Sequence, residues 1–327
     1  MRYIILLVLA TILMQTLVAD RIYEGSLRQS GSRQTAGDQF LLAMLYDSGL
    51  GFDRNKVEAI KWLRLSAENH FPRAQYRLGL CYYHGNGVEQ DYTAAIDWFS
   101  MAANQGLPEA QYSLGLCYAM GQGTQQDCSL AVRWFRRAAE QGYSKAQYCL
   151  GCCYYFGEGV NTNKEESLKW YSRAAQSGYA RAQYSLGCCY DFGEGSSANP
   201  SEALKWYQSA AAQGHPGAQF NLAAIYFNGD GVPVNYEEAL KWYQKSADQG
   251  FADAQFALGN CYYTGKGVER DDLEAVFWWT LAATNGHESA QYNIDKIGEE
   301  LTSEQQELMQ SKAEAWLNKH QGGLIAN

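Results

Sequence analysis

The feature that most constrains this chain is a repeat of 36 residues whose register does not slip. The tripeptide Ala-Gln-Tyr or Ala-Gln-Phe begins at Ala74, Ala110, Ala146, Ala182, Ala218, Ala254 and Ala290. A tryptophan recurs with the same spacing, at Trp62, Trp98, Trp134, Trp170, Trp206, Trp242 and Trp278. Units of this length bury their apolar faces only against their neighbours, so the period predicts a solenoid. We therefore expect a chain that holds a partner rather than one that transforms a substrate.

The composition fits one folded, elongated array. Of the 327 residues, 46% are hydrophobic and 19% are charged, as in globular proteins. The formal net charge is -9, and no basic cluster interrupts the sequence. Because a protein that follows nucleic-acid phosphates needs a basic face, this charge argues against nucleic acid as a partner.

The first 19 residues predict a secretory signal peptide. Arg2 precedes an apolar run over residues 4–18, and the small residue Ala19 precedes a polar turn. The run is shorter than the ~20 apolar residues of a comfortable membrane span, so we expect cleavage, export and no stable membrane insertion afterwards. An uncleaved anchor is the alternative, because Leu17 matches a cleavage site poorly. The expected location is the periplasm or the medium, or the secretory-pathway lumen in a eukaryote.

Each unit predicts a helical hairpin, and we number its places from the alanine, so that Ala74 is place 1. An amphipathic stripe with helical spacing runs through Tyr76, Leu78, Cys81 and Tyr82. Glycines at places 12 and 14, here Gly85 and Gly87, then close the first helix. Glycine suits this position because it tolerates the left-handed backbone that ends a helix.

The second helix of each unit begins at an aspartate or asparagine. These good N-caps are Asn55, Asp91, Asp127, Asn163, Asn199, Asn235 and Asp271. Five units carry a glutamate three residues later, which predicts a capping box. Small residues at place 6, such as Gly79, let the two helices approach, and we expect the tryptophan to fill the space nearby. A glycine at place 33 closes the second helix, although His70 replaces it in the first unit.

These residues resemble the Sel1-like repeat family, a relative of the tetratricopeptide repeat. The matching pattern is A-Q-Y-x-L-G-x-x-Y, then G-x-G-V, then D-x-x-x-A-x-x-W-x-x-x-A-A and a closing glycine. It covers seven units in residues 38–289, after a linker at 20–37. A half-repeat and a C-terminal capping helix, with Thr302 as its cap, follow in 290–320, and 321–327 form a tail. The resemblance implies an all-α fold, a right-handed α/α superhelix of stacked hairpins, and adaptor roles in bacterial envelopes, host contact or a secretory lumen.

In related solenoids the first helix of each hairpin lines the concave face, and the resemblance implies the same here. The core stripe uses places 3, 5, 8 and 9, so places 7, 10 and 11 point toward the groove. Aromatic residues are frequent at these places and predict anchors for a protein or an extended peptide. The alternative is that these aromatics pack between repeats. The residues expected to bind the partner are Tyr83, His84, Met120, Tyr155, Phe156, Asp191, Phe192, Phe227, Asn228 and Tyr263.

Most of the nine cysteines follow the repeat. Place 8 holds Cys81, Cys117, Cys153, Cys189, Cys261 and, in one unit, Ile225. A place shared with isoleucine is a core place, where cysteine behaves as a small hydrophobe. Equivalent atoms of stacked repeats lie ~10 Å apart, beyond the ~7 Å Cα limit of a disulfide, so serial disulfides are not expected. The cluster between Cys149 and Cys189 keeps one alternative function open, a cysteine-dependent redox or metal-binding protein.

Other chemistry-bearing motifs are missing. The sequence has no G-x-S-x-G, H-E-x-x-H, Walker loop or dinucleotide fingerprint. We therefore predict a non-catalytic, monomeric scaffold without cofactor or metal. His215 and His287 follow a closing glycine and are expected to be exposed loop residues. The place 2 glutamines, such as Gln75 and Gln111, are too uniform for a selective site, and we expect them to bond to backbone between adjacent hairpins.

Overall fold

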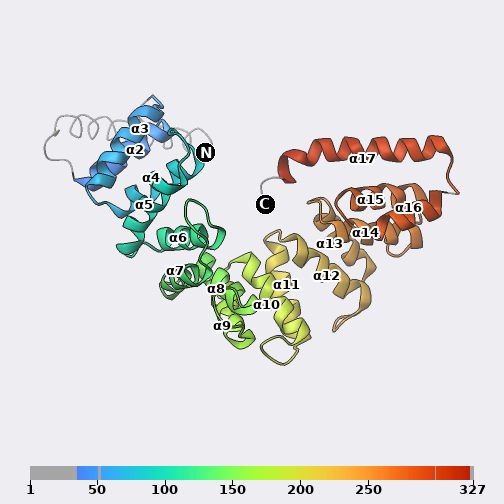
Figure 1. The fold of residues 1–327 in the computed structure, drawn as a ribbon. Helices are drawn as coiled ribbons and strands as arrows, with labels where there is room; N and C mark the ends of the chain where they lie inside the picture. The colour runs from blue at the N-terminus through green and yellow to red at the C-terminus, as the bar shows by residue number, and fades with distance from the viewer. Residues whose placement is uncertain (1–34, 51–52, 299, 325–327) are drawn as a thin grey trace, which may run out of the picture. The chain divides into compact units, whose positions relative to one another are not determined.

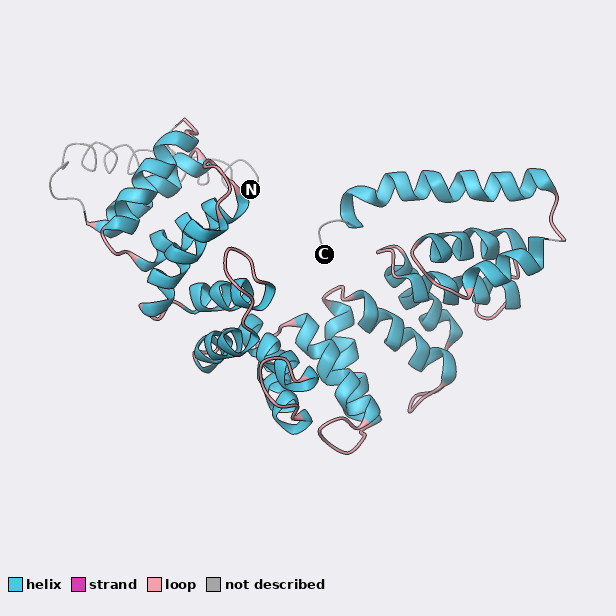
Figure 2. Ribbon diagram, in the orientation of Figure 1, coloured by secondary structure: helices cyan, strands magenta, loops and turns pink. Residues whose placement is uncertain are grey.

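The computed structural model describes residues 35–50, 53–298 and 300–324, and all regular structure in these residues is helical (Figures 1 and 2). The predicted signal peptide lies outside the described residues. Within them, no helix combines the length and the apolarity that a membrane span requires. The helices fall into two compact units, which divide between Thr162 and Asn163.

The described helices pair into stacked hairpins, which confirms the predicted all-α solenoid. The first unit contains α2 (Ala36–Ser48), α3 (Lys56–Glu68), α4 (Pro72–His84), α5 (Tyr92–Asn104), α6 (Pro108–Met120), α7 (Cys128–Glu140) and α8 (Ser144–Phe156). The second contains α9 (Lys164–Gln176), α10 (Ala180–Phe192), α11 (Pro200–Ala212), α12 (Pro216–Asn228), α13 (Tyr236–Ala247), α14 (Ala252–Thr264), α15 (Asp272–Thr284), α16 (Ala290–Gly298) and α17 (Ser303–Leu324). Within each unit the second helix of a hairpin, such as α5 after α4, packs on the first helix of the next hairpin.

The predicted N-caps form, but the predicted capping box does not. Each aspartate or asparagine cap accepts a backbone N–H from the first turn of its helix, as Asn199 does from Glu202. In four units the glutamate side chain pairs instead with a lysine three residues later, for example Glu202 with Lys205 at 2.5 Å. The backbone N–H of the cap is already satisfied by a carbonyl of the first helix, as Asp91 N–H is by the Tyr82 carbonyl at 2.9 Å. The glutamate therefore has no donor left to satisfy at the cap.

The two helices of a hairpin meet at the small residue of place 6, and the ring that covers it is not the predicted tryptophan. A Cβ added to Gly79 would lie 2.6 Å from the Phe99 ring, and one added to Gly115 would lie 2.6 Å from the Phe135 ring. This ring belongs to the residue after the tryptophan, as it does for Gly187 with Tyr207 and for Gly259 with Trp279. Trp98 itself packs at the junction with the preceding hairpin. Successive helical residues point about 100° apart, so neighbouring rings serve different interfaces.

Glutamine at place 2 joins adjacent hairpins, as predicted. The amide of Gln219 is buried and donates to the Ala211 carbonyl, on the second helix of the preceding hairpin, at 3.2 Å. Its carbonyl oxygen accepts from Gln249, at the end of its own hairpin, at 2.8 Å. Equivalent bonds from place 2 to the preceding hairpin start at Gln75, Gln111, Gln147, Gln183 and Gln255.

Helix α17 is the predicted C-terminal capping helix and packs along α15. Place 24 is charged in the other six repeats, at Lys61, Asp97, Arg133, Lys169, Lys205 and Lys241. In α15 this place holds Phe277, which α17 buries to 4% exposure. Lys312 of α17 lies 4.5 Å from the Phe277 ring and 2.6 Å from the Glu274 carboxylate. Thr302 caps α17, because its hydroxyl oxygen accepts from the Gln305 N–H at 3.3 Å.

Candidate partner-binding surface

The aromatic residues at place 10 are half-buried, and two of them contact a side chain of the next repeat. The Tyr83 ring lies 5.1 Å from that of Tyr92, and its hydroxyl donates to the Gln122 side chain of the next repeat. The Phe227 ring lies 5.0 Å from the Tyr236 ring, with the Lys266 amine of the next repeat 5.2 Å away. The Tyr263 ring lies 5.6 Å from the Trp279 ring of its own repeat, and Tyr155 is also half-buried. Tyr83 and Phe227 thus contribute to packing between repeats.

Gln122 and Lys266 contact these rings from place 13, a loop position that our sequence reasoning missed. The signal was present, because from Ala74 onward place 13 varies from unit to unit among Asn, Gln, Glu, Asp and Lys. The side chain at this loop position decides which group meets the aromatic ring of the preceding repeat. The surface near place 10 is therefore built jointly by two consecutive repeats.

Asp191 stands at place 10, where four other repeats carry a ring, and its carboxylate accepts a hydrogen bond from a buried tyrosine. The Tyr207 side chain is fully buried, and its hydroxyl donates to the Asp191 carboxylate at 3.1 Å. Burial raises the pKa of the Tyr207 hydroxyl above its ordinary range. In the last full repeat the buried donor is the Trp279 indole N–H, and the Asn260 side chain accepts from it at 3.2 Å. Where the buried ring on the second helix carries a hydrogen-bond donor, the first helix thus carries an acceptor side chain, since a buried donor needs an acceptor.

The residues at place 11 are exposed, in contrast to the rings one place earlier. Each is the last residue of its helix and is followed by a glycine with left-handed backbone, such as Gly193 after Phe192. The exposed fraction is 53% for Met120, 66% for Phe156 and 73% for Phe192. His84 and Asn228 occupy the same place and are exposed as well. We call these five the helix-end residues.

Large exposed apolar side chains at a recurrent place have no role in holding the hairpins together. Phe156 contacts the ring of its neighbour Tyr155, with centroids 4.8 Å apart, but two thirds of its surface stays in solvent. Such side chains cost free energy in water and release it when a partner covers them. Aromatic residues and methionine are also enriched at protein interfaces. The helix-end residues are therefore the part of the predicted site that can still accept a partner.

The place 8 cysteines are core residues, as their shared place predicts. Cys117, Cys153 and Cys261 are buried, and burial raises the pKa of Cys117 to about 11, of Cys153 to about 12 and of Cys261 to about 11. Thiols with such pKa values are poor nucleophiles near neutral pH, because the thiolate is the reactive form. Among the described residues, no three His, Cys, Asp or Glu side chains gather into a set that could hold a metal ion.

Two histidines contradict the expectation of simple exposed loop residues. His215 is half-buried and stacks on the Tyr184 ring at 4.5 Å, and its Nδ1 accepts from the Ala218 N–H at 3.2 Å. Burial lowers the pKa of His215. His287 stacks on the Phe256 ring at 4.0 Å. The residue after a closing glycine leads into the first helix of the next hairpin, so its ring packs on an aromatic residue of the preceding first helix.

Comparison with known proteins agrees with this architecture. Seven consecutive segments match the Sel1 repeat, namely residues 38–71, 72–107, 108–143, 144–179, 180–215, 216–251 and 252–287. The crystal structure of a Sel1 repeat protein from Oxalobacter formigenes is 34% identical, covers 85% of this chain and 79% of its own, and gives a TM-score of 0.69. A protective antigen of uropathogenic Escherichia coli is 27% identical, with 93% and 83% of the two chains covered and a TM-score of 0.45. No curated protein matches the chain.

Proposed function

Because the chain belongs to the Sel1 repeat family, we propose that it is a non-catalytic scaffold that binds another protein through its helix-end residues. The partner is a folded protein or an extended peptide with apolar side chains. The concave face of each unit is the expected setting, as the first helices of related solenoids suggest. Rigid hairpins favour such binding, because a preorganised surface loses little entropy on association.

One observation carries the proposal. Met120, Phe156 and Phe192 end three successive first helices with more than half of each side chain exposed. At the preceding place, Tyr83 and Phe227 are engaged by the next repeat, so the scaffold accounts for their rings. The helix-end side chains contribute little to that packing, and partner binding gives them a role.

Export is a further part of the proposal and rests on residues 1–19. In this account the mature chain acts as a monomer in the periplasm, the medium or a secretory lumen. Expression of the full chain in its natural host, followed by N-terminal sequencing, tests this directly. A mature N-terminus near Asp20 supports export, whereas a retained Met1 in the cytoplasmic fraction contradicts it.

Site-specific cross-linking tests the binding surface. A photoreactive phenylalanine analogue is placed at position 120, 156 or 192 in the full chain, and cells are irradiated before lysis. We expect each position to yield the same cross-linked protein. Met101 provides the matched control, because it is an exposed methionine (47%) on a second helix. The same product at an equal yield from position 101 would refute the assignment of the surface. So would the absence of any cross-linked product at positions 120, 156 and 192.

A further inference from the structure

The capping helix α17 is held on the second unit by a narrow apolar contact. Among its described side chains, residues 303–320, only Met309 and Ala313 are buried, at 5% and 1% exposure, and Trp316 is half-buried. The shorter helix α15 buries seven side chains. We call Met309, Ala313 and Trp316 the seam of α17, because their spacing of four and three residues places them on one face of the helix.

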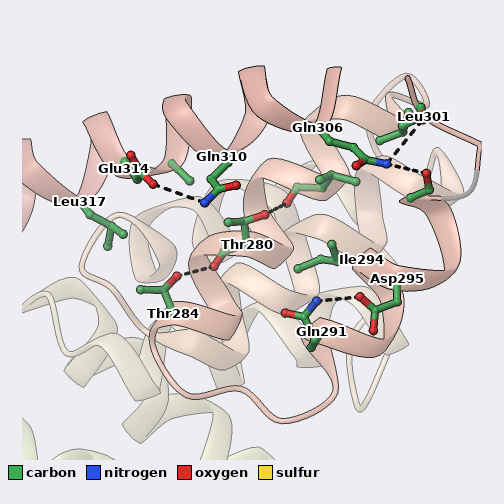
Figure 3. A pocket seen from close by; sticks show the side chains of 13 residues that line it. Thr280, Thr284, Gln291, Ile294, Asp295, Leu301, Gln306, Gln310, Glu314 and Leu317 are labelled. Atoms are coloured by element: carbon green, nitrogen blue, oxygen red, sulfur yellow. Dashed lines mark hydrogen bonds between the residues drawn. The ribbon is translucent and has the colours of Figure 1, made fainter. Parts of the chain in front are cut away.

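An open groove of about 620 Å³ lies beside this seam, between α15, α16 and α17 (Figure 3). The polar side chains that line the groove bond mainly within their own helices. The Thr280 hydroxyl donates to the Val276 carbonyl at 2.7 Å, and the Gln310 amide donates to Glu314 at 3.5 Å. Among the described residues that line the groove, only the side chain of Gln306 bonds outside its own helix, to the Gly298 carbonyl at 2.7 Å. Side-chain hydrogen bonds therefore contribute little to holding α17 along the groove.

One charged contact accompanies the seam. The Lys312 amine lies 2.6 Å from the Glu274 carboxylate and 4.5 Å from the Phe277 ring of α15. The lysine side chain is 46% exposed, and an ion pair that water can reach adds little to stability. This contact therefore specifies how a helix lies on α15 more than it holds the helix there.

The face of α15 beneath α17 is apolar where the other repeats are polar. Phe277 occupies place 24, which is charged in the other six repeats, and its neighbour Val276 is 5% exposed. Loss of α17 would bring the Phe277 ring into water, which is unfavourable for an apolar surface. Another helix with the pattern of α17 would relieve this exposure equally well.

We propose that α17 is a displaceable cap, and that the face of α15 beneath it binds an amphipathic helix of a partner. The seam defines the chemistry of that helix: an apolar residue, a small residue four positions later and an aromatic residue three positions after that. A basic residue directly before the small one reaches Glu274, as Lys312 does. Anchors at this spacing are those of helices that lie in apolar grooves. The partner helix displaces α17 by competing for the same contacts on α15.

This surface is separate from the helix-end residues and does not depend on the proposed function. It lies on the second helix of the last full repeat, whereas the helix-end residues lie on first helices. A failure of one assignment leaves the other untouched.

Hydrogen exchange of the full chain, followed by mass spectrometry, tests the displaceable cap. A segment with few buried contacts opens at a lower free energy than the stack, and a displaced single helix frays in water. Amides of residues 303–317 should therefore exchange at least tenfold faster than those of α14. Equal protection of α17 and α14 would overturn the proposal.

A labelled peptide with the sequence of residues 303–320 serves as the partner helix, and fluorescence anisotropy measures its binding to the full chain. Ala313→Asp places an unpaired charge in the seam of the chain's own α17 and uncovers α15. This variant should bind the peptide at least tenfold more tightly than the wild type, in which α17 competes. Leu308→Asp is the matched control, because Leu308 of α17 is 58% exposed, and it should bind the peptide as the wild type does.

Two further changes locate the peptide on α15. Phe277→Lys, added to Ala313→Asp, introduces a charge at place 24 and should remove peptide binding, and the thermal unfolding midpoint shows whether this variant is folded. A peptide with Lys312→Glu tests the contact with Glu274 without altering the protein, and it should bind at least threefold more weakly. No gain in binding from Ala313→Asp, or equal binding of the two peptides, would overturn the proposal. A concentration-dependent dimer of the wild type would assign the face to a second copy of the chain and overturn it as well.

Discussion

At the scale of single residues, the small residue at place 6 sets how closely the two helices of a hairpin approach. Gly115 faces the Phe135 ring, and the space for a Cβ is already occupied. Gly37, in the first turn of α2, has no such neighbour, because an added Cβ would meet only the Thr35 hydroxyl at 3.6 Å. The same substitution should therefore have opposite consequences at these two glycines.

We expect Gly115→Ala to destabilise the protein by about 1–3 kcal/mol, since the ring or the helix must shift to admit a methyl group. Gly37→Ala should be neutral or stabilising, because alanine is the better helix former and fits without overlap. Urea unfolding followed by circular dichroism measures both. A Gly115→Ala variant as stable as the wild type would show that the helices do not pack as closely as the structure has them.

His70 carries a residue-scale strain that the repeat makes visible. It adopts a φ of 60°, at the place where the other units have a closing glycine such as Gly106 with φ 92°. An L-residue in this region costs about 1–2 kcal/mol, part of which is offset by the lower backbone entropy of a non-glycine residue when unfolded. His70→Gly should therefore raise the free energy of unfolding by about 0.5–1 kcal/mol.

His84→Gly is the matched control, because His84 is exposed and ends a helix with ordinary right-handed backbone. This variant should lose up to about 1 kcal/mol, the cost of glycine in a helix. Urea unfolding of the two variants in parallel provides the comparison. If His70→Gly were destabilised as much as His84→Gly, the left-handed backbone at His70 would not lower the stability of the wild type.

At the scale of helices and their junctions, the sequence predicted the features that are local or that recur. Glycine pairs, asparagine and aspartate caps and the place 2 glutamines depend on nearby backbone, so their spacing was sufficient. The sequence did not determine which ring, Trp98 or Phe99, covers the small residue at place 6, because adjacent apolar residues give the same periodicity. The difference in burial between Tyr83 and His84 also escaped prediction, since the loop of the next repeat reaches Tyr83 through Gln122. The groove beside α17 was not foreseen, because α16 ends where the register of the repeat breaks.

The glutamine of each junction should contribute measurably to stacking. Gln219→Leu leaves the Ala211 carbonyl and the Gln249 amide without their partner in a buried junction, and we expect a loss of about 1–3 kcal/mol. Gln208→Leu is the control, because Gln208 is exposed on α11. The free energy of unfolding from urea titration distinguishes them. Equal stability of both variants would mean that water replaces the lost bonds at the junction.

At the scale of the whole molecule, buried thiols and tyrosines make stability depend on alkaline pH. Burial raises the pKa of Cys117 and Cys261 to about 11 and of Cys153 to about 12, while an unfolded thiol titrates near 9.0. Burial also raises the pKa of Tyr207 and Tyr243. Above pH 9 the unfolded chain therefore loses protons that the folded chain keeps, and stability falls as pH rises.

The free energy of unfolding from urea titration should be constant up to about pH 8.5 and decrease steadily between pH 9 and 11, by at most about 1.4 kcal/mol per pH unit for each fully buried thiol. Cys117→Val should make the decrease shallower, because place 8 accepts the branched apolar Ile225 in another repeat. A midpoint independent of pH from 8 to 11 would contradict the burial of these groups.

The central claim concerns the whole array: its repeated residues build the scaffold, and the helix-end residues bind the partner. The most direct measurement is the dissociation constant of the cross-linked partner, once purified, for Met120→Ser, Phe192→Ser and the control Met101→Ser. All three side chains are exposed, so the free energy of unfolding should change by less than about 0.5 kcal/mol. We predict that Met120→Ser and Phe192→Ser each weaken binding at least tenfold, whereas Met101→Ser leaves it within twofold. Unchanged affinity in both helix-end variants would contradict the account.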